Sequence, residues 1–165
     1  YLKSTQPGRD PEVVERLRGN LLSTATRIKE TAESHPYARS LGDQYYWGGN
    51  GGVARQSMLL EAAAELSGDE AYREAILHCV HHLFGRNVHG RSYVTGIGHE
   101  PPQNPHARRS GGDDVDAPWP GYLVGGPNPG PHDWFDVQPS YQTNEIAINW
   151  NGALIYALAA AIQRG

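Results

Sequence analysis

One stretch of the sequence, residues 88–142, limits most strongly what this chain can fold into. Its 55 residues hold 9 of the chain's 12 prolines and show no helical period of apolar side chains. A loop much longer than ~15 residues is uncommon inside a compact domain, where it is usually either disordered or functional. Disorder is disfavoured here, because a solvated linker would lack the aromatic anchors Tyr93, Trp119, Tyr122, Trp134, Phe135 and Tyr141. We therefore expect an ordered binding or catalytic loop laid across one end of a helical scaffold.

Apolar side chains at helical spacing on both sides of this loop predict the scaffold. The spacing predicts helices over about 10–34, 53–66, 69–84 and 144–162. Asp10 before Pro11 is typical of a helix start, and Ser67-Gly68 joins the second and third helices as an antiparallel hairpin. The last helix is rich in Ala and Leu and apolar on most sides, which favours a buried position. The sequence thus predicts an all-α fold of about four helices plus one long ordered loop.

Composition and charge exclude several classes of partner. Fourteen Lys and Arg stand against 18 Asp and Glu, a formal net charge of −4, so the basic footprint that nucleic-acid binding needs is missing. No apolar stretch approaches the roughly 18 residues of a membrane span. The single Cys79 rules out an internal disulfide and a multi-thiolate metal site. We therefore expect neither nucleic acid nor a membrane as a partner.

Because the chain opens on Tyr1 without a signal segment, we expect it to begin inside a longer gene product or after processing.

Two groups of residues could bind a metal ion. His78 and His82 would share a helix face, a spacing that suits zinc, but without a nearby third ligand surface and packing roles are favoured. The acidic run at 113–116, Asp-Asp-Val-Asp, favours a surface turn, and a calcium site built from hard oxygen ligands is the alternative. We predict that the chemistry requires no cofactor, with structural calcium as the open alternative.

A rigid polar segment lies at 101–108. Prolines at 101, 102 and 105 fix φ at about −65° and favour extended conformations in the residues before them. His106 and Arg108 are two residues apart, so in an extended segment they project to the same side. A histidine and an arginine on one rigid wall suit recognition of hydroxyl or carboxylate groups. A histidine in a solvated turn is the plainer alternative.

A second polar segment, 134–145, combines acids with aromatic rings. Asp136 precedes the predicted last helix and Glu145 lies in its first turn, where the helix dipole favours an acid. Ordinary helix capping is one explanation. The other is catalytic, because a carboxyl group beside Trp and Tyr rings is desolvated, which raises its pKa and lets it hold a proton. Such an acid suits sugar chemistry, since rings stack on pyranose faces while the acid protonates a glycosidic oxygen.

Five motifs, in order along the chain, carry a resemblance to a known family. The two main ones are SYVTGIG at 92–98 leading to PHAR at 105–108, and WxDx4Yx3ExAx3N from Trp134 to Asn151. Supporting motifs are YWGGN at 46–50, FGRN at 84–87 and PGYLVGGPN at 120–128. By these motifs the chain resembles glycoside hydrolase family 9, the cellulase family with an (α/α)6 barrel, from about residue 10 to its end. The resemblance implies that residues 1–165 are the C-terminal part of such a catalytic domain, with a catalytic loop at 88–142.

The resemblance also implies roles for individual residues. It makes Glu145 the general acid and Asp136 a supporting carboxylate, and it places His106 in the catalytic group, near the cleavage point. Arg108 is implied to bind sugar beside His106. The aromatic residues implied to bind substrate are Trp47, similar to a family stacking platform, with Tyr46 and Trp150.

The implied reaction is hydrolysis of β-1,4-glucosidic bonds in cellulose or related β-glucans. Family members are inverting enzymes, and inversion needs a second carboxylate ~6.5–9.5 Å from the acid to activate water. The family supplies this base from an early Asp pair that has no counterpart here, so we expect it in a missing N-terminal part, in the same or a companion chain. The chain alone is then expected to be inactive. A non-catalytic carbohydrate-binding or structural fragment, and an exo-acting glucosidase on short β-glucan oligosaccharides, are the alternatives. The polymeric substrate implies secretion.

Overall fold

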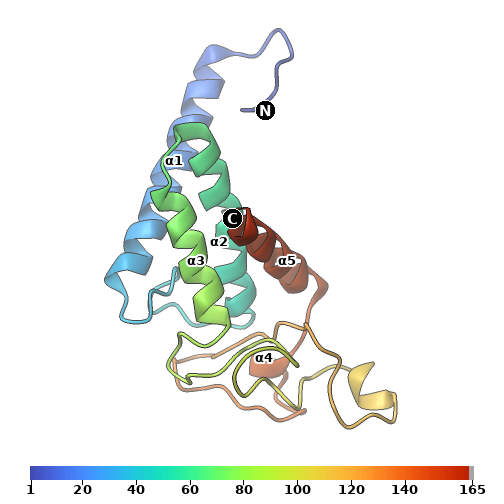
Figure 1. Cartoon of the computed structure of the whole chain (residues 1–165). Helices are drawn as coiled ribbons and strands as arrows, with labels where there is room; N and C mark the ends of the chain where they lie inside the picture. The colour runs from blue at the N-terminus through green and yellow to red at the C-terminus, as the bar shows by residue number, and fades with distance from the viewer. Residues whose placement is uncertain (164–165) are drawn as a thin grey trace.

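The computed structural model describes residues 1–163, and its regular elements are helices joined by turns and one long loop (Figure 1). The helices are α1 (Pro11–Ser34), α2 (Gly49–Ser67), α3 (Ala71–Leu83), the single turn α4 (Tyr141–Asn144) and α5 (Ile148–Ile162), with a 3-10 turn, η1, at Ser110–Gly112. Within the described residues, extended backbone pairs through isolated bridges, such as Val94 with Leu123. The predicted all-α fold is confirmed.

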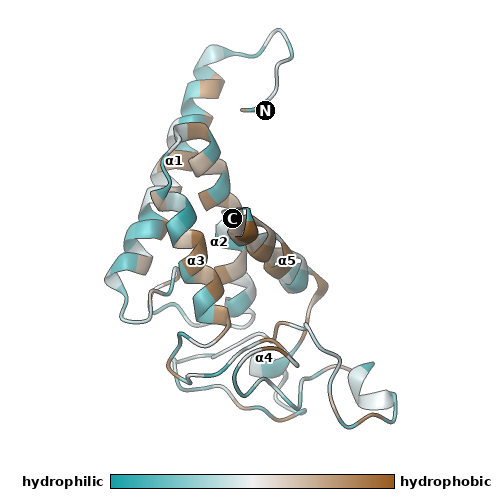
Figure 2. Ribbon diagram, in the orientation of Figure 1, coloured by the Kyte–Doolittle hydropathy of each residue, from teal (hydrophilic) through white to brown (hydrophobic). Residues whose placement is uncertain are grey.

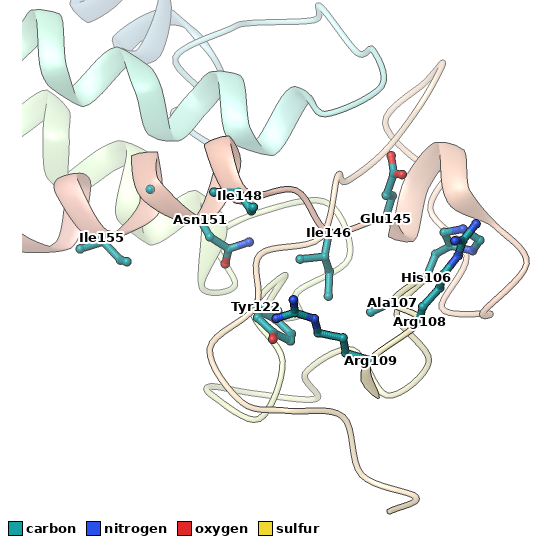
Figure 3. Close-up of a pocket in the computed structure, with 11 residues that line it drawn as sticks. His106, Ala107, Arg108, Arg109, Tyr122, Glu145, Ile146, Ile148, Asn151 and Ile155 are labelled. Atoms are coloured by element: carbon teal, nitrogen blue, oxygen red, sulfur yellow. The ribbon is translucent and has the colours of Figure 1, made fainter. Parts of the chain in front are cut away.

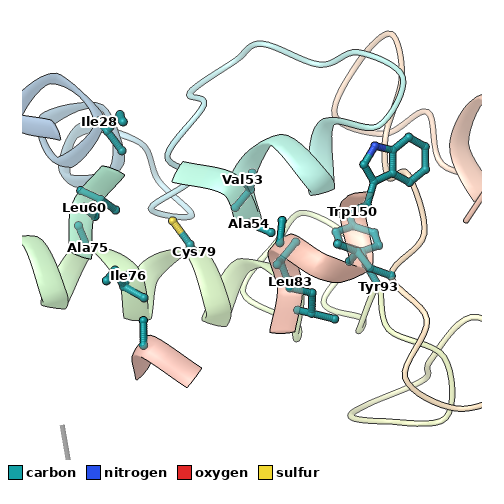
Figure 4. Packing of buried hydrophobic residues seen from close by; sticks show 14 of the residues in the cluster. Ile28, Val53, Ala54, Leu60, Ala75, Ile76, Cys79, Leu83, Tyr93 and Trp150 are labelled. Carbon is teal, nitrogen blue, oxygen red and sulfur yellow. The ribbon is translucent and has the colours of Figure 1, made fainter. Parts of the chain in front are cut away.

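The helices pack around one apolar core. α2 lies against α1, α3 and α5, and α3 also contacts α1 and α5. Ile28 of α1, Val53 of α2 and Ile76 of α3 belong to one buried cluster (Figure 4). Tyr93 and Trp134 of the proline-rich loop are buried in the same cluster. The loop is therefore an ordered element anchored to one end of the helices.

α2 begins at Gly49, before the predicted start at 53, because its glycines pack against an aromatic ring. Gly48 caps the helix in a left-handed conformation, with φ at +79°. A Cβ added at Gly51 would lie 2.3 Å from Cδ1 of Trp150, and one at Gly48 would lie 2.4 Å from Cζ2 of the same ring. The glycine run, which lies before the predicted helix start at 53, is thus the surface on which α2 meets α5.

α5 begins at Ile148, so the residues just before it are extended rather than helical. Glu145 has a ψ of 155°. Ile146 pairs in antiparallel fashion with Val124, and the Glu145 carbonyl accepts a hydrogen bond from the Gly125 N–H at 2.9 Å. These partners occupy backbone groups that a longer helix would have bonded internally. The predicted position of Glu145 in the first turn of the last helix is therefore wrong, because this residue lies between α4 and α5.

The two sides of α5 differ in what covers them. One side packs into the core through Trp150, Ala153, Leu154, Ala157 and Ala160. The other side carries Ile148, Ile155 and Ile162, seven residues apart and all exposed, with Ile148 at 94%. Figure 2 shows the strongly hydrophobic colouring of this helix. The prediction of a helix buried on most sides holds for one side only. Over residues 1–163, none of the helices has both the length and the apolar character that a membrane crossing needs.

Two nitrogen-rich side chains are buried among the apolar ones. His82 of α3 lies beside Tyr93, with ring centroids 6.0 Å apart, and neither of its ring nitrogens has a hydrogen-bond partner among the described residues. Burial lowers the pKa of His82 to about 3, and the positive charge of Arg39 acts in the same direction. Arg39 stacks over the Tyr45 ring at 4.2 Å and donates to the Gly42 carbonyl at 2.6 Å. His82 is therefore neutral in the folded chain at neutral pH.

Replacing Gly51 by Ala should destabilise the fold, because the new methyl group and the Trp150 ring cannot occupy the same space. Overpacking of this kind costs about 1–3 kcal/mol. Chemical denaturation of the intact domain would show a lower midpoint. Gly19→Ala in α1 is the matched control, since its Cβ meets nothing within 4 Å and Ala is about 1 kcal/mol better than Gly inside a helix. A parent-like midpoint in Gly51→Ala would contradict the tight contact.

The buried His82 should make the fold acid-sensitive. Its pKa is about 3 in the folded chain against an ordinary value of 6.5, so the unfolded state binds more protons below pH 6.5. Stability should be complete above that pH and fall toward pH 3, by up to about 1.4 kcal/mol per pH unit.

His82→Phe keeps a ring of similar size and loses no hydrogen bond between described residues, so it should flatten the pH dependence in a denaturation series on the intact domain. The control is His81→Phe, which removes an exposed imidazole one residue away. An unchanged slope in His82→Phe would overturn this assignment.

Candidate active site

A cavity of about 700 Å³ lies between the long loop and α5. Figure 3 shows Glu145, His106 and Arg108 toward one end of it, and Ile148 and Ile155 of α5 toward the other. Arg109, Tyr122 and Asn151 also line it. Glu145 and His106 are half-buried, whereas Arg108 is exposed. The structure thus brings three of the sequence-predicted residues to one concave site, and His106 and Arg108 line the same wall as expected.

Hydrogen bonds hold His106 at the wall of the cavity. Its backbone N–H donates to the Asn144 carbonyl at 2.8 Å, and its backbone forms a parallel bridge with Glu145. Nδ1 lies 2.8 Å from the carbonyl oxygen of Gln138. Because a carbonyl can only accept, Nδ1 carries the proton of this bond, which leaves Nε2 for a ligand. The imidazole is therefore oriented beside the segment that carries Glu145.

Asp136 is surrounded by hydrogen-bond donors. Its Oδ2 accepts from the Gln103 N–H at 2.8 Å, and its Oδ1 accepts from the Asn104 N–H at 2.9 Å and from Asn144 Nδ2 at 3.1 Å. Arg91 Nη2 lies 3.7 Å from Oδ2. The carboxyl group that was expected beside aromatic rings is therefore held by hydrogen bonds. Asp136 is not among the side chains that line the cavity, and its contacts tie the start of the 101–108 wall to the loop around residue 136.

The three predicted aromatic residues have different exposures. Trp47 is 55% exposed and stands edge-on to Trp150, with ring centroids 6.3 Å apart. Trp150 is only 7% exposed, because its ring fills the space over the glycines of α2. The predicted contact of Trp150 with sugar is therefore corrected: its ring supports Trp47 from within the core. Tyr46 is partly exposed, and its hydroxyl fills the space that a side chain at Gly52 would need.

The sequence analysis missed two polar residues beside the site. Asn144 is fully buried and bonds to both Asp136 and the indole Nε1 of Trp134. Arg91 lies over the Trp134 ring at 5.0 Å and donates to the Glu100 carbonyl at 2.9 Å. The available signal for Asn144 was its position directly before the acid of the second motif. Spacing alone cannot reveal that this amide is buried.

Two of the residues weighed as metal ligands, His78 and Asp113, have other partners, and a third is buried. His78 Nδ1 is 2.8 Å from Arg86 Nη2, and His82 lies in the core. Asp113 accepts hydrogen bonds from the Val115 N–H and from the indole of Trp119. Over residues 1–163, no group of three His, Cys, Asp or Glu side chains is placed to hold a metal ion.

Known proteins are similar to this chain in sequence and in fold over nearly its whole length. The model of glycosyl hydrolase family 9 matches residues 12–158. Endoglucanase D of Acetivibrio thermocellus is 57% identical over 162 residues, which cover 98% of this chain and 26% of that protein. A xyloglucan-specific endo-β-1,4-glucanase of Bacteroides ovatus is 36% identical, over 95% of this chain and 30% of that protein. The structure of AaCel9A in complex with cellobiose-like isofagomine superimposes with a TM-score of 0.90 at 31% identity, over 100% of this chain and 34% of that one.

The helices and the loop that covers their end form a portion of an (α/α)6 barrel, the fold of the family 9 structures that the chain matches. The chain belongs to glycosyl hydrolase family 9. It spans about a quarter of the length of the Endoglucanase D that it matches and about a third of the matched structure. The predicted barrel portion and the family resemblance are both confirmed.

Asp136→Asn should loosen the wall that carries His106. An amide in place of the carboxylate turns an NH2 group toward at least one of the N–H donors, which removes a hydrogen bond to a charged acceptor worth about 1.5–3 kcal/mol. Hydrogen exchange at the amides of Gln103 and Asn104 should become faster in the intact domain. Asp133→Asn is the matched control, because within residues 1–163 the Asp133 side chain accepts one hydrogen bond, from the Gly130 N–H, and Asn keeps an oxygen for it. Parent-like protection of Gln103 and Asn104 in Asp136→Asn would contradict this role.

Proposed function

We propose that the complete domain containing this chain hydrolyses β-1,4-glucosidic bonds in cellulose or related β-glucans, with Glu145 as the general acid of an inverting reaction. Two relatives, an endoglucanase and a xyloglucan-specific endo-β-1,4-glucanase, support this substrate class. The observation that carries the proposal is the meeting of Glu145, His106 and Arg108 in one cavity, next to the long loop that the family motifs mark.

The chemistry of each group fits a glucan. The Glu145 carboxyl group donates its proton to the glycosidic oxygen as the bond to the leaving sugar breaks. Arg108 carries fixed N–H donors, and His106 keeps Nε2 for a ligand, so both suit sugar hydroxyl groups. Trp47 offers an exposed ring for stacking on a pyranose, with Trp150 holding it from below and Tyr46 beside it.

The second carboxylate belongs to the part of the domain outside this chain. Among the described residues that line the cavity, Glu145 is the one acid. Inversion needs a base ~6.5–9.5 Å from it, and relatives are several times longer than this chain. We place the base, an Asp pair, in that remaining part, which also covers the exposed isoleucines of α5. The 165 residues alone would then be inactive, and the polymeric substrate would require secretion.

Two other functions fit some of the same observations. A carbohydrate-binding fragment needs the rings and His106 without an acid, and an exo-acting enzyme on short oligosaccharides needs a cleft that is closed at one end. The binding fragment predicts no hydrolysis, and the exo-acting enzyme predicts faster hydrolysis of short oligosaccharides than of long chains.

Glu145→Gln in the complete domain should abolish hydrolysis of unactivated cello-oligosaccharides while leaving the fold intact, because an amide cannot donate the proton. General acid catalysis contributes about 10²–10⁴-fold, so a loss of at least that size is expected. Reducing-end assays on cellotetraose measure it, with the exposed Glu30→Gln of α1 as the matched control. Retained activity in Glu145→Gln would refute the acid assignment, and an inactive parent domain would favour the binding function.

A further inference from the structure

One buried side chain, at the last residue of α4, joins two separate parts of the long loop to the segment that carries Glu145. Asn144, fully buried, donates from Nδ2 to the Asn104 carbonyl at 2.6 Å and to Asp136 Oδ1 at 3.1 Å. Its Oδ1 accepts the indole Nε1–H of Trp134 at 3.2 Å. Both N–H bonds and the carbonyl of this amide are therefore used. The segment before His106, the segment of Asp136 and the segment of Glu145 meet at this one group.

The main chain of the same residue extends the connection to the site. The Asn144 carbonyl accepts the His106 N–H at 2.8 Å, and the next residue in the chain is Glu145, which forms a parallel bridge with His106. Figure 3 shows Glu145 and His106 on these neighbouring segments. A shift of residue 144 therefore moves the acid and the histidine relative to each other.

We propose that Asn144 is a positioning residue that fixes the Glu145 carboxyl group relative to the His106 wall of the cavity. This proposal rests on the proposed function, in which Glu145 delivers a proton to the leaving oxygen. Proton delivery depends on distance and alignment, and a misplacement of about 1 Å can cost 10²-fold in rate. Asn144 is not among the residues that line the cavity, so its effect passes through Glu145.

The chemistry of the three partners explains why an asparagine is needed. The Asn104 carbonyl and the Asp136 carboxylate are acceptors, whereas the Trp134 indole is a donor. A carboxylate at position 144 would have almost the same shape but would face two acceptors, one of them charged. Asn144→Asp therefore breaks the two bonds that hold the 104–106 and 136 segments while it keeps the bond to Trp134.

The test compares two substrates that differ in their need for an acid. In cellotetraose the leaving group is a hydroxyl oxygen of a glucose unit, which needs protonation as the bond breaks, whereas 2,4-dinitrophenyl β-cellobioside releases a stable phenolate, which does not. In the complete domain, Asn144→Asp should lower kcat/KM about 100-fold for cellotetraose and no more than about threefold for the aryl glycoside, in line with the separate contribution of acid catalysis. The ratio of the two constants does not depend on how much of the preparation is folded.

Controls separate a positioning role from a structural one. Asn87→Asp changes another buried asparagine, whose side-chain amide, among the residues that the structure describes, bonds to the main chain of His82, His89 and Arg91. It should lower the unfolding midpoint and leave the ratio of the two substrates unchanged. Asn144→Ser, which retains a small donor and acceptor, should give an intermediate ratio and provides folded protein if Asn144→Asp does not fold.

The outcomes distinguish this inference from the proposed function. Glu145→Gln should give the same split between the two substrates, and if it does not, the acid assignment itself fails. Glu145→Gln can show the split while Asn144→Asp and Asn144→Ser lower kcat/KM equally for the two substrates, or leave both values unchanged. In that case the positioning role of Asn144 is wrong and the proposed function stands.

Discussion

The packing of the Trp150 ring against the glycines of α2 is the contact on which the site depends. No side chain fits at Gly48 or Gly51 beside this ring, so the two helix starts meet closely. Asn50, in the same turn of α2, donates from its N–H to the Gly125 carbonyl at 3.0 Å and from Nδ2 to the Val124 carbonyl at 3.1 Å. The loop segment that pairs with Ile146 is thereby fixed to the helices, and through it the backbone of Glu145.

Periodicity predicted the helices because their apolar stripes are local properties of the sequence. The predicted helix starts that were wrong are those of α2 and α5, which depend on contacts with residues far away in the sequence. The glycine run before residue 53 has weak helix propensity, yet it is helical because a ring from a segment 100 residues later fills the space. Glu145 was predicted in the first turn of the last helix, yet it is extended because Val124 and Gly125 supply backbone partners to its segment. In both places tertiary contacts, rather than the local sequence pattern, decide where the helix begins.

The site residues were predicted from motifs, and their environments were not. His106, Arg108 and Glu145 meet at one cavity, which the family resemblance could imply. The donors around Asp136 come from residues 32 and 33 positions earlier, on a segment whose path no spacing rule gives. The burial of Trp150 could not be inferred either, since an aromatic beside a predicted acid suits stacking on sugar as well as packing in a core.

The cavity is polar at one end and apolar at the other, and this asymmetry links its chemistry to its assembly. The isoleucines of α5 are exposed in this chain, and covering such a side chain contributes about 1.5–3 kcal/mol. Under the proposed function, the part of the domain that covers them is also the part that brings the second carboxylate into the cavity. The exposed face of α5 and the missing base are then two aspects of one incomplete barrel. The contacts that complete the core would also set the separation of the two acids, on which the stereochemical course of hydrolysis depends.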